Sequence, residues 1–238
     1  MDYKHKPAEN EVLQFLMAQD ADVICLQEVD VYKNDEFLTL PDVKQVLGKK
    51  YPYSYLDFII YDKRHQFGMM VWSKYPLIHK QSIHYETIGN MSNRCDIVVG
   101  QDTLRLFNNH LESYNLSPED FEQIEHIKAK WKRAIPLRNK QAQIIRAEIE
   151  ASPYPVIVVG DFNSVALSFA YWHISRGLHD AWNETHHFWQ WGSTFDYKNI
   201  GVRIDYILSS DSLKPTRCII PSAASGSDHK PVVATLEW

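Results

Sequence analysis

Short apolar runs rich in β-branched residues recur along the whole chain, and this pattern restricts the fold more than any other feature. The first run is Val-Ile-Cys-Leu at residues 23–26, and turn residues punctuate most of the runs. Such runs are typical of buried strands. We predict strands at residues 23–26, 58–61, 67–72, 94–99, 103–109, 156–159, 202–208 and 232–236.

Segments with helical spacing of apolar residues lie between some of these strands, and the first covers residues 8–19. A second helix is expected to begin at Ser117. Serine can cap a helix, Pro118 suits the first helical position, and Asp120 can reach back to the cap. We expect Pro136 to interrupt this helix and the part after it to lie on a sheet. Strands that alternate with helices indicate α/β or α+β layers.

Composition supports a globular chain and excludes several classes of protein. The 238 residues have a formal net charge of −5, 45% hydrophobic residues and no repeat or Gly/Ser linker, so we expect one domain. No apolar run approaches the roughly 20 residues of a membrane span, and we expect a soluble chain. The three cysteines are scattered and form no CxxC pair, which argues against a disulfide framework, a zinc site or a redox site.

The charge balance gives only a weak indication of partners. An acidic chain is a poor candidate for holding nucleic acid by bulk charge, because phosphate neutralisation needs Lys and Arg on the contact face. Residues 126–146 do contain seven bases and no acid. We favour a solvated helix face for this run, with a basic groove as the alternative.

Several of the apolar runs end in acids or amides. Gln27 and Glu28 come where the first strand is expected to stop, and carboxylates at strand ends often present oxygen ligands at the rim of a sheet. After residues 156–159, Gly160 lets the chain turn and leaves Asp161 and Asn163 on a loop. Taken alone, Glu28 fits a surface acid, and the loop fits an ordinary Asx turn.

Three further positions carry titratable side chains at or near strands. Asp205 lies inside a predicted strand, on the face opposite its two neighbours, where a lone carboxylate is costly unless it is paired or bound to metal. Asp228 and His229 precede the last strand, and histidine exchanges protons readily near neutral pH. His110 follows the strand at 103–109 and, taken alone, fits a structural role.

Together these motifs resemble the endonuclease/exonuclease/phosphatase superfamily. LQE, NHLES, GDFNS, RIDYIL and SDHKPV occur in the family's order over residues 26–232. The NHL form is more similar to the pancreatic-type deoxyribonuclease and deadenylase-like branches than to the abasic-site endonuclease branch. The resemblance implies an α/β (α+β) fold, namely a four-layer α/β/β/α sandwich with two packed mixed β-sheets flanked by helices.

The resemblance also implies a metal and a way to bind phosphate. Glu28 would be the main ligand of Mg²⁺, with Asp228 as a further ligand or as an acid behind the ligands, and Mn²⁺ or Ca²⁺ as substitutes. Hard oxygen ligands fit these ions. Asn163 would hold a phosphate oxygen. Arg94, at the start of a predicted strand, resembles an arginine that the family often uses near the phosphate.

The remaining roles concern the proton and the water. Asp161 would position or deprotonate the attacking water. His229, oriented by Asp205, would bind the phosphate or donate a proton. His110 would make a second contact with the developing charge. An in-line attack on a phosphodiester needs this arrangement, because its negative oxygens must be neutralised while water approaches from the opposite side.

The resemblance departs from the family at the beginning of the chain. Family members open with a strand that carries an Asn, and no such strand precedes Pro7. We therefore expect residues 1–238 to be a single domain that lacks this first strand. The cellular location stays open, with the extracytoplasmic domain of a longer secreted or membrane-anchored protein as one expectation.

The function expected from the resemblance is a divalent-metal-dependent hydrolase of phosphate esters, of the phosphodiesterase or nuclease type. The alternatives are a phosphomonoesterase, a lipid phosphodiesterase, and a catalytically weak ligand-binding domain. The substrate stays open between nucleic acid, nucleotide and lipid headgroup, and we expect a monomer without a protein partner. Residues 179–199 are rich in aromatic side chains. This segment could stack a base or meet a lipid headgroup, but we favour a loop packed onto the sandwich.

Overall fold

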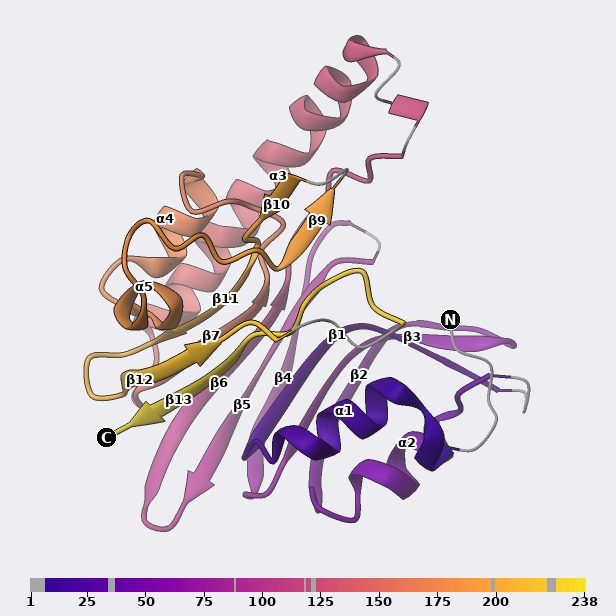
Figure 1. Cartoon of the computed structure of the whole chain (residues 1–238), viewed down its shortest axis with the longest axis vertical. Helices are drawn as coiled ribbons and strands as arrows, with labels where there is room; N and C mark the ends of the chain where they lie inside the picture. The colour runs from indigo at the N-terminus through magenta and orange to yellow at the C-terminus, as the bar shows by residue number, and fades with distance from the viewer. Residues whose placement is uncertain are drawn as a thin grey trace.

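Two β-sheets pack face to face in the computed structural model, and helices cover both outer faces (Figure 1). The structure describes residues 7–33, 37–87, 89–117, 119–120, 123–197, 200–221 and 226–238. The larger sheet has the strand order β4-β5-β6-β7-β11-β8. Its strands are β4 (Leu77–His84), β5 (Met91–Val99), β6 (Asp102–His110), β7 (Val156–Asp161), β8 (His179–Asp180) and β11 (Asp205–Ser209).

The smaller sheet has the order β1-β3-β2, and two strand pairs, β9-β10 and β12-β13, complete the β-structure of the described residues. The strands are β1 (Val23–Tyr32), β2 (Tyr53–Tyr61), β3 (His65–Ser73), β9 (Phe195–Tyr197), β10 (Ile200–Val202), β12 (Lys214–Ile219) and β13 (Val233–Glu237). The helices are a 3₁₀ turn at Pro7–Glu9, α1 (Glu11–Gln19), α2 (Leu40–Leu47), α3 (Ile124–Glu150), α4 (Phe169–Ser175) and α5 (Ala181–Thr185). None of the described helices is long and apolar enough to cross a membrane.

Three apolar clusters define the layers. One joins α1 and α2 to the outer face of the smaller sheet, around Leu47 and Trp72. The second lies between the two sheets, around Val71 and Leu106. The third joins α3 and α4 to the outer face of the larger sheet, and Phe107 belongs to it. Neighbouring residues of one strand therefore pack in different layers, as the strand period of two requires. The predicted four-layer α/β/β/α sandwich is confirmed.

The long helix α3 differs from its prediction. It begins at Ile124 rather than at Ser117 and runs through Pro136 without a break. Pro136 lies on the exposed side, while Ala134 and Arg138 are buried on either side of it, so packing outweighs the missing backbone hydrogen bond. The Asp120 carboxylate does accept a hydrogen bond from the Ser117 N–H at 2.7 Å. Pro118 lies outside the described residues.

Three strand boundaries differ from the sequence-based expectation in ways that shape the site. β1 does not stop at residue 26 but continues to Tyr32 through a bulge at Glu28, whose φ of 51° lies in the left-handed region. β7 continues through Asp161, which therefore belongs to the sheet and not to a loop. The strand predicted at 202–208 is split into β10 and β11, so Asp205 begins a strand instead of lying within one.

Gly160 allows β7 to continue to Asp161. Its φ is 124°, and a Cβ atom at this position would lie 2.0 Å from the Asn109 carbonyl oxygen on the neighbouring strand. Both the backbone conformation and the close approach of two main chains therefore require glycine.

We predict that Gly160→Ala lowers the free energy of unfolding by about 3 kcal/mol or more, because it combines a strained φ with a backbone clash. Chemical denaturation measures this change. Gly100→Ala is the matched control. Gly100 also has a positive φ, 62°, but nothing lies within 4 Å of its added Cβ, so we expect a loss of only about 1 kcal/mol. Equal losses in the two variants would contradict the close-approach argument.

Candidate active site

Strand pairing brings three of the predicted site residues to one edge of the larger sheet. β6 and β7 are parallel, and His110 lies opposite Asp161. β7 and β11 are antiparallel, and Asp161 lies opposite Asp205. The last residues of β6 and β7 and the first residue of β11 therefore form one row across three neighbouring strands.

The carboxylates of Asp161 and Asp205 share this row with the imidazole of His229. His229 Nδ1 lies 2.9 Å from Asp205 Oδ2, in a hydrogen-bonded ion pair. Asp161, Asp205 and His229 offer ligand atoms that all lie within 4.8 Å of one another. In the part of the chain that the structure describes, no other group of three or more His, Cys, Asp or Glu side chains meets this condition.

The pKa values of this cluster are moved by burial and by charge. Burial raises the pKa of Asp161 to about 7, and the neighbouring Asp205 carboxylate adds to the rise. Burial lowers the pKa of His229, but the hydrogen bond and the negative charge of Asp205 outweigh it and raise the pKa to about 9. At neutral pH, His229 is therefore a cation, while Asp161 is poised to exchange a proton.

Asn163 holds Asp161 in position. Its backbone N–H donates to Asp161 Oδ1 at 2.6 Å, and its side-chain amide donates to Asp161 Oδ2 at 2.8 Å and to the Leu111 carbonyl at 2.9 Å. The φ of Asn163 is 49°, a left-handed conformation that asparagine tolerates better than most residues. In this structure the amide N–H groups of Asn163 fix the carboxylate beside them.

Glu28 reaches the same edge from the other sheet. Its Oε1 lies 3.0 Å from His110 Nε2, and Asp161 Oδ2 lies 3.9 Å from the same nitrogen. The ion pair with His110 lowers the pKa of Glu28. Burial lowers the pKa of His110, but Glu28 and Asp161 outweigh it and raise it overall. Glu28 thus links the smaller sheet to the three-strand row of the larger one, with a side chain that is 60% exposed.

Residues outside the predicted set support this arrangement from behind. Gln27 Nε2 donates to Asn108 Oδ1 at 2.5 Å, and Asn108 Nδ2 donates to the Leu26 carbonyl at 3.3 Å, which ties the bulge in β1 to β6. Asn108 is fully buried. The sequence motifs included Gln27 beside Glu28 but gave it no role, and Asn108, two residues before His110, was missed although its closeness to this motif could have identified it.

Thr194 and Phe195 are a second missed pair. Thr194 Oγ1 accepts hydrogen bonds from the backbone N–H groups of Ile204 at 3.0 Å and Asp205 at 3.2 Å, which fixes the start of β11. The Phe195 ring lies 4.9 Å from the His229 ring, centroid to centroid. These contacts join segments that are 10 or more residues apart, and no sequence motif marks them.

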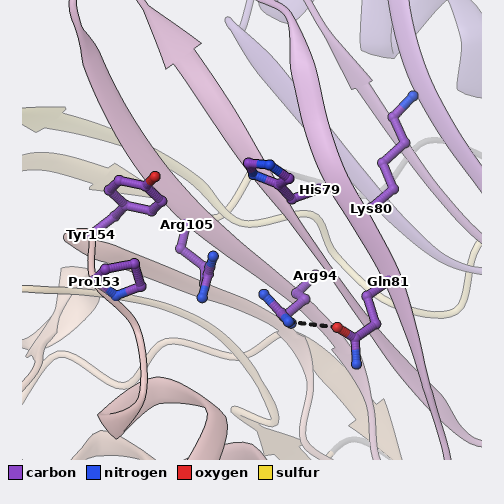
Figure 2. Close-up of a pocket in the computed structure, with 7 residues that line it drawn as sticks. All are labelled: His79, Lys80, Gln81, Arg94, Arg105, Pro153 and Tyr154. Atoms are coloured by element: carbon purple, nitrogen blue, oxygen red, sulfur yellow. Dashed lines mark hydrogen bonds between the residues drawn. The ribbon is translucent and has the colours of Figure 1, made fainter.

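Two residues of the predicted set lie apart from the cluster. Asp228 is exposed and does not belong to the group of three, although its charge contributes to the raised pKa of His229. Arg94 lies on the face of the larger sheet that α3 covers, where its Nε is 3.2 Å from Glu148. It lines a pocket with residues of β4 and β6 (Figure 2). The structure therefore gives Arg94 surroundings other than the carboxylate cluster.

The aromatic segment is only partly packed. Trp182 stacks on His186 with ring centroids 3.6 Å apart, as expected for a packed loop. The expectation is wrong for Phe188, Trp189 and Trp191, which are 94%, 60% and 92% exposed. These three side chains form the aromatic tip, a short surface loop that ends three residues before Thr194.

Acids accompany the basic run of α3. Lys130 pairs with Asp120 at 2.5 Å, and Arg133 pairs with Glu112 at 2.7 Å. Arg138 is 2% exposed and donates to the Glu112 carbonyl. These bases therefore act largely within the fold.

Comparison with known proteins agrees with the fold and identifies the family. The family model described as "Endonuclease/Exonuclease/phosphatase family" matches residues 6–229. The chain belongs to this family, whose members hydrolyse phosphate esters and generally use a divalent metal. The comparison with curated proteins found no match.

Solved structures share the fold at low sequence identity. An endonuclease/exonuclease/phosphatase from Beutenbergia cavernae superimposes with a TM-score of 0.73 at 15% identity, over 96% of this chain. This chain spans only 65% of the length of that protein. A family protein from Leptotrichia buccalis gives a TM-score of 0.68 at 19% identity, over 96% of this chain and 92% of its own. Truncated TDP2 from Caenorhabditis elegans gives a TM-score of 0.67 at 20% identity, over 94% of this chain and 88% of its own.

The residues at the edge of the sheet fit a divalent cation. Asp161 and Asp205 place two carboxylates on directly paired positions, where burial and then the negative charge of Asp205 raise the pKa of Asp161. The exposed carboxylate of Glu28 faces the same edge. Oxygen donors of this kind are the ligands that Mg²⁺, Mn²⁺ and Ca²⁺ prefer.

We predict that Asp161→Asn stabilises the metal-free protein at alkaline pH. The folded-state pKa of Asp161, about 7, lies above its unfolded value, so its contribution to stability is complete below about pH 4 and is lost as the pH rises through 7. In EDTA, the free energy of unfolding of the variant should exceed that of the wild type by about 1 to 3 kcal/mol at pH 8, and by less at pH 5.

Thermal denaturation at both pH values measures this difference. Asp102→Asn, at the exposed first residue of β6, is the control and should change stability equally at the two pH values. A stabilisation by Asp161→Asn that does not depend on pH would contradict the charged-carboxylate argument.

Proposed function

We propose that this protein is a divalent-metal-dependent phosphodiesterase that cleaves its substrate by in-line attack of water. One observation carries the proposal: Asp161, Asp205 and His229 converge at the edge of the sheet that Glu28 and His110 also reach. Acids that differ in pKa, next to the protonated imidazole of His229, suit a reaction in which water loses a proton while phosphate oxygens gain negative charge. A domain that only binds a ligand needs no such difference in pKa.

In this proposal, His229 binds the phosphate or donates a proton. Its raised pKa keeps it protonated at neutral pH, and Asp205 occupies its Nδ1, so Nε2 is the nitrogen that can donate to a phosphate oxygen or to the leaving group. The Phe195 ring beside His229 limits how the imidazole can turn. His110, whose pKa is raised by Glu28 and Asp161 against the effect of burial, makes the second contact with the developing charge.

Asp161 would act as the general base that deprotonates the attacking water. A carboxylate with a pKa of about 7 is half ionised near neutral pH, which is the condition for an efficient general base. Asn163 holds both of its oxygens, so the carboxylate is fixed before the substrate arrives. This fixed position reduces the reorganisation that the reaction requires.

Mg²⁺ would be held by Glu28, with Asp228 as a candidate second ligand and Mn²⁺ or Ca²⁺ as substitutes. When bound, such an ion neutralises phosphate oxygens and stabilises the charge of the transition state. The negative charge that Asp161 and Asp205 bring to this edge favours its binding.

The aromatic tip, residues 188–191, would contact the part of the substrate beyond the scissile phosphate. It ends three residues before Thr194, which fixes Asp205, and four residues before Phe195, which contacts His229. Exposed aromatic rings bind planar or apolar groups by stacking. A nucleotide diester is the substrate class that uses both the phosphate site and the rings, with a lipid phosphodiester as the alternative.

We predict that Glu28→Gln and His229→Ala each reduce kcat/KM for bis-p-nitrophenyl phosphate at least 100-fold, and that EDTA abolishes turnover until Mg²⁺ is restored. Removing a group that stabilises transition-state charge typically costs this much. His84→Ala, on the exposed surface of β4, is the control and should keep the wild-type rate. Unchanged hydrolysis in the first two variants would overturn the proposal and favour a binding domain.

We predict that the double variant Phe188→Ala, Trp191→Ala raises KM about tenfold for thymidine 5′-p-nitrophenyl phosphate, since the loss of a stacking contact costs roughly 1 to 3 kcal/mol. The effect on kcat should be much smaller. Trp131→Ala, a half-exposed aromatic on α3, is the matched control. An unchanged KM in the double variant would show that the aromatic tip does not contact the substrate.

A further inference from the structure

A cavity of about 450 Å³ opens on the larger sheet, away from the candidate active site (Figure 2). It lies where β4, β5 and β6 face the loop between α3 and β7. Arg105, on its wall, lies opposite Val156, which precedes Asp161 by five residues along β7. Five strand residues span about 16 Å, so one small ligand cannot touch both places. The lining residues are His79, Lys80, Gln81, Arg94, Arg105, Pro153 and Tyr154.

A buried carboxylate holds two of the lining side chains from behind. Asp96, whose side chain is fully buried, accepts hydrogen bonds from Arg105 Nε at 2.7 Å and Arg105 Nη2 at 3.0 Å. Its Oδ2 also lies 2.9 Å from His79 Nδ1. The guanidinium and the imidazole are therefore fixed by an acid beneath the cavity, not by one that faces into it.

Arg94 enters the cavity from the neighbouring strand. Its Nη2 donates to Gln81 Oε1 at 2.5 Å, and its Nε faces Glu148 at 3.2 Å. Arg105 lies opposite Asp96, two residues along β5 from Arg94, so both arginines project from the same face of the sheet, and Figure 2 shows both among the lining side chains. Each guanidinium already faces one carboxylate, Asp96 or Glu148, and its remaining N–H groups are donors for a ligand.

The backbone of β4 is shaped around this cavity. The pairing of β4 with β5 shifts register between Ile78 and Gln81, and His79 adopts a φ of 47°. A bulge with a left-handed residue re-aims side chains, and left-handed histidine is uncommon. The bulge places His79, Lys80 and Gln81 together on the cavity wall.

The lining is chemically selective. It contains no carboxylate, and each of its polar side chains carries an N–H or O–H donor. Asp96 and Glu148 balance the charges of Arg105 and Arg94, and the Lys80 ammonium donates to the Ser54 carbonyl at 2.9 Å. The Tyr154 ring lies 5.5 Å from the Arg105 guanidinium and, with Pro153, forms an apolar wall. Donors on several sides of one cavity match a tetrahedral oxyanion.

We propose that this cavity binds a phosphoryl anion, either inorganic phosphate or the phosphate group of a small phosphomonoester, at a site separate from the candidate active site. Arg94 and Arg105 would hold its oxygens, with His79 as a further lining side chain. The proposal rests on the geometry of this cavity and does not depend on the hydrolytic function. It gives Arg94 a phosphate-binding role away from the carboxylate cluster.

Isothermal titration of the full chain with inorganic phosphate in EDTA tests the proposal. Arg94→Gln and His79→Gln should each weaken binding roughly tenfold, as the loss of one hydrogen bond to a charged group does. His229→Ala should retain the wild-type affinity, and so should Lys132→Gln, a control on the exposed surface of α3. Thermal denaturation confirms that the variants fold, and His79 is exposed, so its replacement leaves the core intact.

Two results would overturn the proposal. One is no binding of phosphate to the wild type at millimolar concentration. The other is binding that His229→Ala abolishes and that both Arg94→Gln and His79→Gln leave unchanged, because the phosphate would then occupy the candidate active site.

Phenyl phosphate, titrated in the same way, distinguishes the two sources of the anion. Tighter binding than inorganic phosphate, with the gain lost in Tyr154→Ala, assigns the site to a phosphomonoester with a planar group. Equal affinity assigns it to inorganic phosphate.

Discussion

The structure depends most on the pairing of Asp161 with Asp205 across two neighbouring strands. Directly opposed carboxylates repel each other, and burial makes the repulsion costly, as the raised pKa of Asp161 shows. The surrounding residues compensate for this repulsion. His229 gives Asp205 a cationic partner, Asn163 donates two hydrogen bonds to Asp161, and a divalent cation at this edge would reduce the remaining negative charge.

Maintaining this edge requires unusual backbone conformations in three places. Glu28 and Asn163 have left-handed φ values, and Gly160 allows β7 to approach Asn109 more closely than any side chain permits. Such conformations cost free energy and persist only where the surrounding packing enforces them. Here the four-layer sandwich supplies that packing, with apolar clusters on both faces of the larger sheet. Stability is thus concentrated in the layers, and the strained residues gather at the edge where the chemistry is proposed.

The sequence predicted the layers well, because β-branched runs and helical spacing report directly on burial. The motifs also identified His110, Asp161, Asp205 and His229, which strand register then brings together. The sequence-based predictions failed where tertiary packing decides where an element begins, ends or continues. α3 passes through Pro136 because buried residues on both sides hold the helix, and β1 passes through Glu28 because a bulge allows the strand to continue. No local sequence pattern identified Thr194, since its hydroxyl accepts a hydrogen bond from Ile204, ten residues further along the chain.

The most direct test of the central claim is a double-mutant cycle between Asp205→Asn and His229→Ala, measured on kcat for bis-p-nitrophenyl phosphate with saturating Mg²⁺. If Asp205 acts by holding His229 protonated and oriented, the two residues form one unit, and the double variant should be about as slow as His229→Ala alone. Multiplicative losses, with each substitution keeping its full effect in the presence of the other, would contradict the account, because the two side chains would then serve the reaction independently.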